Sequence, residues 1–277
     1  MTFFWLASYP KSGNTWFRML LSNLDATEPA DINALTERAT IASARGPFDD
    51  ITLTESAELY PSEIEQLRTG VYRTIALGEY RDGSGNFRKV HDAYAEAFGV
   101  ARGAVVVVRD PRAIAPSLAH HFGRSIDRAI AMMASDEAFL GGGYGPGSQL
   151  RQSLRNWSAH VASWLEQRDL PVFLLRYEEL KAEAPMAFAR ALAFCGRHVS
   201  AVDARNAALF SHFDVLQAQE TAQGFRERAA TAPFFRRGEA ESWRDELSAG
   251  QIERIETRHG AMMRRLGYAL VSEGCVA

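Results

Sequence analysis

The residues with the clearest chemical character lie near the start of the chain, in the stretch YPKSGNTW at residues 9–16. The stretch follows a short apolar run, residues 3–8, and leads into a helical pattern over residues 14–24, which predicts a strand, a tight loop and a helix. Such a loop brings backbone N–H groups and the positive end of a helix dipole to one point, where anions bind. The sequence therefore predicts a phosphate-binding loop.

Side chains of this loop add donors to the predicted anion site. Gly13 allows close approach of the backbone, and Lys11 places a mobile positive charge beside the bound group. Trp16 is a candidate to lie against a purine ring. Hydroxyl and amide donors are available on Ser12, Asn14 and Thr15. The alternative is a plain strand, turn and helix, with Gly13 as a turn former and Trp16 in the core.

The position of Lys11 argues against an ordinary nucleotide hydrolase. In the motif G-x-x-x-x-G-K-[ST] the lysine follows the second glycine and reaches the β- and γ-phosphates. Here Lys11 precedes Gly13, and no earlier glycine supplies the loop. Such hydrolases also need an apolar strand that ends in a Mg²⁺-binding aspartate. The only match here is the weak one in VVVVRD, where Arg109 stands between the apolar run and the aspartate.

Two stretches carry a resemblance to a known family. YPKSGNTW resembles the YPKSGTTW signature with which cytosolic-type sulfotransferases hold the 5′-phosphosulfate of 3′-phosphoadenosine 5′-phosphosulfate (PAPS), with Asn14 replacing the more usual threonine. VVVVRDPRAIAPSL resembles the family's strand ending in arginine with a serine eight residues later, here Arg109 and Ser117, which implies that both hold the 3′-phosphate. A guanidinium at the end of a parallel strand independently suits phosphate contact, although an ion pair with Asp110 is the alternative.

Further elements follow in the family's order. FFRRGEAESW resembles the family's RKGxxGDW segment, loosely after the glycine, and implies a second clamp on the 3′-phosphate. LLRYEELK and SHFDVL are similar to two elements beside the adenine. The alternatives are a solvated charge run for the first and core packing for the aromatic residues. The nucleotide-binding residues so implied are Tyr177, Ser211, Phe213, Arg236, Arg237 and Gly238.

Sulfuryl transfer to an alcohol, phenol or amine needs a base, because the acceptor loses a proton as it attacks. A histidine that is neutral near pH 7 suits this task. The family supplies it from a KTH strand end, which RKVH at residues 88–91 resembles. The resemblance thus implies His91 as the base, with His120 and His121 as alternatives because they follow Ser117 by less than a turn.

The resemblance also gives Lys11 a catalytic role. As the S–O bond breaks, negative charge grows on the bridging oxygen, and an ammonium there stabilises the transition state more than the ground state. In the family the serine equivalent to Ser117 contacts this lysine, which implies a third catalytic residue. We expect no metal ion, because a sulfuryl group carries less negative charge than a phosphoryl group and the sequence has no cluster with metal-ligand spacing.

The elements that must position these residues alternate between strands and helices. Apolar runs predict strands over residues 3–8, 104–109 and 171–177, with a weaker candidate over residues 87–91. Helical patterns follow the first three, so the sequence predicts an α/β fold with a central, mainly parallel sheet flanked by helices and a P-loop-like phosphate-binding unit.

We expect one domain over residues 1–277. Residues 28–86 are expected to form a helical insertion that caps the acceptor, and the glycine-rich residues 138–150 a mobile loop. The helical pattern of residues 249–266 has an apolar stripe, which more often packs on its own domain than forms a dimer. A monomer or a homodimer is therefore expected.

Composition narrows the class of protein. Of the 277 residues 47% are hydrophobic and 23% charged, as in ordinary globular proteins, and the net charge of −3 argues against nucleic-acid binding. Two cysteines are too few for a disulfide framework, and no apolar stretch is long enough to span a membrane. A cytoplasmic location without a membrane partner is predicted.

The sequence thus predicts a PAPS-dependent sulfotransferase. The expected reaction is in-line transfer of a sulfuryl group from PAPS to a hydroxyl or amine of a small-molecule acceptor, with release of adenosine 3′,5′-bisphosphate (PAP). A phenol or a secondary metabolite is the expected acceptor. The alternatives are a phosphotransferase of related fold (a kinase) and a PAP-binding module without catalysis.

Overall fold

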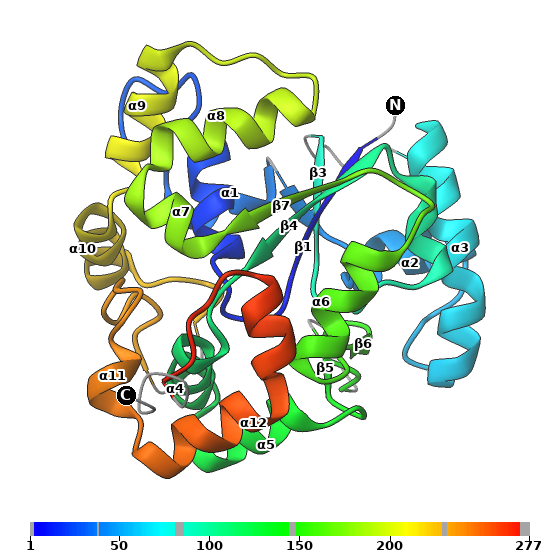
Figure 1. Cartoon of the computed structure of the whole chain (residues 1–277). Helices are drawn as coiled ribbons and strands as arrows, with labels where there is room; N and C mark the ends of the chain where they lie inside the picture. The colour runs from blue at the N-terminus through cyan, green and yellow to red at the C-terminus, as the bar shows by residue number, and fades with distance from the viewer. Residues whose placement is uncertain (1–2, 38, 81–85, 144–147, 229–231, 272–277) are drawn as a thin grey trace.

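A five-stranded parallel sheet forms the centre of the molecule (Figure 1). The structure, a computed structural model, describes residues 3–37, 39–80, 86–143, 148–228 and 232–271. The strands in spatial order are β2 (Ala39–Ile41), β3 (Phe87–Val90), β1 (Phe4–Ser8), β4 (Gly103–Val108) and β7 (Val172–Arg176). The predicted α/β fold with a mainly parallel sheet is confirmed.

β1 and β4 lie in the middle of the sheet and are buried along their whole length. Continuous apolar runs form such strands, because both faces are covered by helices. On one face α1 (Asn14–Ser22) and α8 (Ala184–Phe194) pack against β1, with the Phe17 and Phe188 rings 5.3 Å apart. On the other face the Trp5 ring lies 5.1 Å from the ring of Tyr72, which belongs to α3 (Pro61–Leu77).

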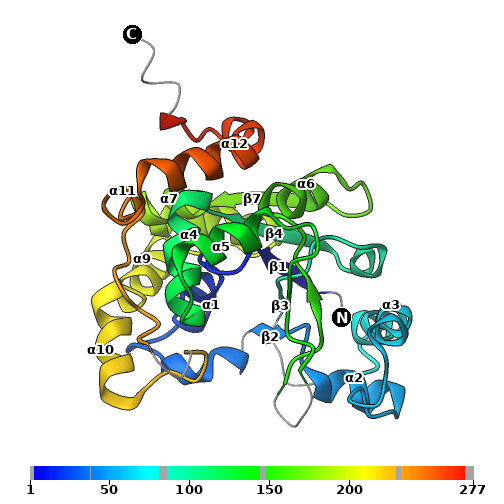
Figure 2. The same cartoon turned by 90° about the horizontal axis from the view of Figure 1, so that it is seen from below.

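The remaining elements surround this core. Seen from below, α2 and α3 lie together at one side of the molecule and α9 and α10 at the opposite side (Figure 2). The helices and strands not yet given are η1 (Ile32–Glu37), α2 (Arg45–Thr52), η2 (Glu96–Val100), α4 (Pro111–Phe122), α5 (Ile126–Ala134), β5 (Phe139–Leu140), β6 (Gln152–Ser153), α6 (Trp157–Glu166), α7 (Tyr177–Ala182), α9 (Ala201–Phe210), α10 (Phe213–Gln223), α11 (Trp243–Glu246) and α12 (Ala249–Arg265).

Two segments differ from the sequence expectation. Residues 28–86 hold η1, α2 and α3, but also the edge strand β2, which pairs with β3 and was not predicted because three residues show no periodicity. The glycine-rich residues 138–150, expected to form only a mobile loop, include the strand β5, which pairs with β6 in a two-stranded antiparallel sheet. Residues 144–147 lie outside the described part of the chain, so the expected mobility is untested.

The C-terminal helix packs on the domain itself. On α12 the apolar side chains of Ile255, Met262 and Met263 are buried in the main core cluster. The amphipathic pattern of residues 249–266 therefore serves intramolecular packing in this chain.

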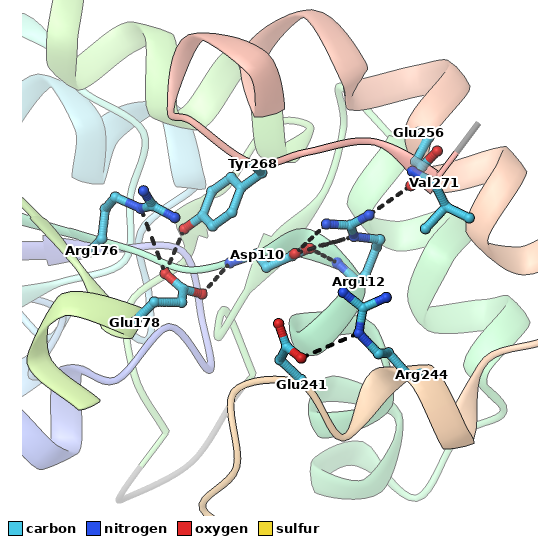
Figure 3. A network of polar contacts seen from close by, with 9 residues as sticks. All are labelled: Asp110, Arg112, Arg176, Glu178, Glu241, Arg244, Glu256, Tyr268 and Val271. Atoms are coloured by element: carbon cyan, nitrogen blue, oxygen red, sulfur yellow. Dashed lines mark hydrogen bonds and ion pairs between the residues drawn. The ribbon is translucent and has the colours of Figure 1, made fainter. Parts of the chain in front are cut away.

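A buried polar network ties α12 to the start of α4 (Figure 3). Asp110 caps α4 by accepting the N–H of Arg112, and its carboxylate also binds the Arg112 guanidinium at 2.6 Å. The same guanidinium binds Glu256 of α12 at 2.7 Å and lies 4.1 Å from the Trp243 ring centroid. Because Asp110 directly follows Arg109, this network fixes the strand end from which that side chain emerges.

Replacing Arg112 with methionine should destabilise the fold. Asp110 and Glu256 would be left as buried carboxylates without their shared cation, which costs about 3–5 kcal/mol. Arg244 is a matched control, since it also lies over Trp243, at 4.5 Å, but is 54% exposed. Urea unfolding of Arg112→Met should show a clearly lower midpoint than that of Arg244→Met, and equal midpoints would contradict this role.

Candidate active site

The predicted phosphate loop has the backbone of an anion-binding nest. Lys11 and Gly13 both have positive φ angles, 67° and 107°, whereas Ser12 between them does not, and Gly13 is the N-cap of α1. Alternating backbone of this kind turns successive N–H groups toward one point. A Cβ atom on Gly13 would lie 2.6 Å from the Tyr177 ring, so only glycine fits there.

Lys11 is half-buried and its ammonium lies 3.7 Å from the centroid of the Phe234 ring. Burial lowers its pKa to about 7, and the charges of Arg109 and Lys89 act in the same direction. An anion bound in the nest would raise the pKa of Lys11 again and so favour its protonated, charged form.

PAP binding should be coupled to proton uptake by Lys11. At pH 8 this side chain is mostly neutral in the free protein, because its pKa is about 7. A bound phosphate favours the ammonium, so binding should take up about one proton at pH 8 and less near pH 5.5, where Lys11 is already charged. Calorimetry in two buffers of different ionisation enthalpy measures this uptake. Uptake of equal size in Lys11→Met would assign it to another group.

Asn14 is turned back toward β1. Its Nδ2 donates to the carbonyl oxygen of Leu6 at 3.0 Å and to Ser8 Oγ at 3.2 Å. The amide therefore braces the junction between strand and loop. Ser12 Oγ, in contrast, is buried and has no hydrogen-bond partner among the residues that the structure describes.

His91 follows β3, and its Nδ1 lies 2.8 Å from the carbonyl oxygen of Ser8. Since a carbonyl only accepts, Nδ1 carries the proton and Nε2 keeps its lone pair. Burial, with the charge of Lys89, lowers the pKa of His91 well below its usual value, so the ring is neutral. His160 donates to the His91 carbonyl oxygen at 3.1 Å and Trp164 to that of Asp92 at 2.9 Å, which fixes this strand end from α6.

The two alternative histidines lie on α4. His120 Nε2 donates to the carbonyl oxygen of Pro233 at 3.1 Å. His121 has its ring 6.0 Å from that of Phe234, and burial together with the charge of Lys11 lowers its pKa to about 4. His121 is thus the alternative that shares surroundings with Lys11.

Lys89 is a site residue that the sequence prediction missed. It pairs in register with Leu6 of β1, and its Nζ lies 3.4 Å from a carboxylate oxygen of Glu227. It lies in β3 two residues before His91, and its charge contributes to the lowered pKa values of both Lys11 and His91. Side chains two residues apart in a strand point to the same face of the sheet. The spacing of Lys89 and His91 in KVH was therefore a signal that could have placed both on one face.

Arg109 contacts both the phosphate loop and the flank of the RRG segment at residues 236–238. Its Nη1 donates to the carbonyl oxygen of Lys11 at 3.2 Å and its Nη2 to that of Glu239 at 3.0 Å. The guanidinium also lies 4.3 Å from the centroid of the Tyr177 ring. The phosphate loop, the end of β4 and the RRG segment are therefore neighbours in space.

The predicted adenine residues also come together. Trp16 donates through its indole N–H to the carbonyl oxygen of Ser211 at 3.0 Å, and its ring lies 5.7 Å from that of Tyr177. Ser211 is fully buried and its hydroxyl accepts a hydrogen bond from Asn23 at 2.9 Å. Gly238, with φ 66°, packs so closely on Phe213 that a Cβ atom would lie 2.3 Å from that ring.

The other predicted phosphate ligands differ in their surroundings. Arg236 forms an ion pair with Glu246 at 2.6 Å, whereas Arg237 is exposed. Ser117 is half-buried on the second turn of α4, and Thr15 is buried in the first turn of α1. In the described part of the chain no three His, Cys, Asp or Glu side chains gather as a metal site.

A parallel sheet with a phosphate nest, a neutral histidine and an arginine at its strand ends defines a nucleotide-binding α/β protein. The sequence profile of the family described as sulfotransferase domain matches residues 103–267, which is more than half of the chain. The chain therefore belongs to the sulfotransferase family. The predicted family and the predicted reaction class, sulfuryl transfer, are confirmed.

Solved structures show the same fold. Mouse sulfotransferase SULT7A1 complexed with PAP is similar with a TM-score of 0.63 and 16% identity over 100% of this chain and 89% of that one. Retinol dehydratase in complex with androsterone and the inactive cofactor PAP has a TM-score of 0.60 and 18% identity over 94% of this chain and 80% of its own. No curated protein sequence matches the chain. None of the helices in the described ranges is long and apolar enough to cross a membrane.

Proposed function

We propose that the protein transfers the sulfuryl group of PAPS to a hydroxyl or amine of a small-molecule acceptor by in-line displacement and releases PAP. The observation that carries this proposal is the pairing of His91 with the phosphate loop. The Ser8 carbonyl that directly precedes the loop binds His91 Nδ1, so a neutral base stands next to the nest that holds Lys11.

The loop fits an anionic 5′ group. Its nest presents backbone donors, Ser12 offers a buried hydroxyl that lacks a partner among the described residues, and Lys11 brings an ammonium. PAPS, when bound, supplies an activated sulfuryl group, and PAP leaves through its 5′-phosphate when that group is transferred. Arg109, Ser117 and Arg237 are the proposed ligands of the 3′-phosphate, and Arg236 joins them if it leaves Glu246.

Each catalytic residue has a distinct task in this proposal. His91 Nε2 takes the proton of the acceptor as its oxygen or nitrogen attacks. The Lys11 ammonium stabilises the charge that develops on the leaving phosphate, and Lys89 adds a second positive charge at the same centre. Ser117 is proposed to contact Lys11 from α4.

The acceptor is proposed to be a small molecule, such as a phenol or a secondary metabolite. Crystal structures of retinol dehydratase with androsterone and with retinol support this size class. The acceptor is expected between the insertion of residues 28–86, the His91 region and α4. We further propose a cytoplasmic monomer or homodimer.

An assay with ³⁵S-labelled PAPS tests the function directly. The purified protein should bind PAP and label at least one member of a panel of phenols, alcohols and amines, with activity that persists in EDTA. Phosphorylation from Mg²⁺-ATP without PAP binding would favour a kinase. Binding of PAP without any transfer over the whole panel would favour a module that has lost catalysis.

A further inference from the structure

The active site holds a carboxylate that the proposed reaction does not use. Glu227 lies between Arg18 of α1 and Lys89 of β3, although these partners are 209 and 138 residues away in sequence. Arg18 is fully buried and its Nη1 lies 2.6 Å from Glu227 Oε1. The other carboxylate oxygen, Oε2, lies 3.4 Å from Lys89 Nζ. A short contact thus fixes the carboxylate, and a longer one reaches the lysine.

We propose that Glu227 is a positioning residue for the transfer reaction: its carboxylate, fixed by Arg18, holds the Lys89 ammonium next to His91 and the phosphate loop. This inference rests on the proposed function. Lys89 is 12% exposed, and among the described residues its ammonium contacts Glu227 alone, so two of its three donors remain to meet an anionic group in the site. A flexible lysine held in this way loses less freedom when the reacting group arrives.

The electrostatics of the centre agree with such a role. Burial lowers the pKa of Lys89, and the Glu227 carboxylate opposes this effect by favouring the charged form of the lysine. Burial alone would raise the pKa of Glu227, but Lys89 and Arg18 lower it to about 2. The other charged or titratable groups that act on one another around this centre are Lys11, His91, Arg109, His120, His121, His160 and Glu220.

A double-mutant cycle tests whether Glu227 acts through Lys89. In the wild-type background Glu227→Gln should lower kcat on the order of 10- to 100-fold and leave the KM for PAPS much less changed. In a Lys89→Met background the same change should cost less than about twofold, because the residue through which it acts is gone. Glu227→Asp, which keeps the charge, should recover part of kcat.

Lysine NMR gives a readout that does not depend on activity. The chain has three lysines, Lys11, Lys89 and Lys181, so ¹³Cε signals of labelled lysine can be assigned with single Lys→Met variants. Lys89 should lose its proton at a lower pH in Glu227→Gln than in the wild type. Glu220→Gln is the matched control, since Glu220 is buried nearby but accepts the N–H groups of Phe234 and Phe235.

The outcomes separate this inference from the proposed function. Equal costs of Glu227→Gln in both backgrounds, with an unchanged Lys89 titration, would show a structural role only and overturn the inference while transfer itself stands. A wild type that binds no PAP and transfers nothing would overturn the proposed function. In that case the NMR titration alone would test whether Glu227 raises the pKa of Lys89. An unchanged Lys89 titration in Glu227→Gln would overturn the inference as well.

Discussion

Replacing His91 with alanine should abolish most sulfuryl transfer while PAP binding remains near the wild-type level. A general base contributes on the order of 10²- to 10⁴-fold, so kcat should fall by that range. PAP binding should persist because the ring of His91 contacts the Ser8 carbonyl and not the nest of Lys11 and Gly13. Steady-state kinetics with labelled PAPS and calorimetry with PAP measure the two properties separately.

The pH dependence of the wild-type enzyme gives a second test of the base. A histidine accepts a proton only while it is neutral, and burial places the pKa of His91 well below 6.5. Transfer should therefore persist as the pH falls through 6.5 and fail only at a distinctly lower pH.

Single variants of the two α4 histidines complete this experiment. Substantial turnover in His91→Ala, together with its loss in His121→Ala, would move the role to His121, which shares surroundings with Lys11. Loss in His120→Ala alone would instead point to the residue that donates to the Pro233 carbonyl oxygen. Loss confined to His91→Ala supports the proposed mechanism.

The parts of the fold that the sequence predicts are those with a strong local pattern. β1 and β4 are buried on both faces and therefore read as continuous apolar runs, and α4 begins at Pro111 after the capping residue Asp110. β2 escaped prediction because the run Ala39–Ile41 is too short for periodicity and depends on pairing with β3.

The same contrast holds for the site. Arg109 could be predicted because it lies in a local motif, and the structure brings it to the Lys11 carbonyl. Glu227 could not be predicted from its own stretch, since both of its partners come from distant elements. The role of Asn14 was equally invisible, because only the folded loop shows that its amide turns toward Leu6 and Ser8.

Replacing Lys11 with methionine should lower kcat by about 10²- to 10³-fold, as expected for the loss of one preorganised group that stabilises developing charge. The KM for PAPS should change much less, because the bridging oxygen carries little charge before the S–O bond breaks. PAP affinity should fall more than PAPS affinity, since the 5′-phosphate of PAP carries the full charge of the leaving group.

Two further variants make the Lys11 prediction specific. Lys11→Arg keeps the positive charge and should recover part of kcat, although a guanidinium differs from an ammonium in shape. Lys181→Met removes an exposed lysine that lies 5.8 Å from the Trp16 ring and not at the phosphate nest, so kcat should stay near the wild-type value. A Lys11→Met enzyme with an unchanged kcat and a raised KM would assign this lysine to uniform binding of the nucleotide. The left-handed backbone of Lys11 would then serve the nest alone.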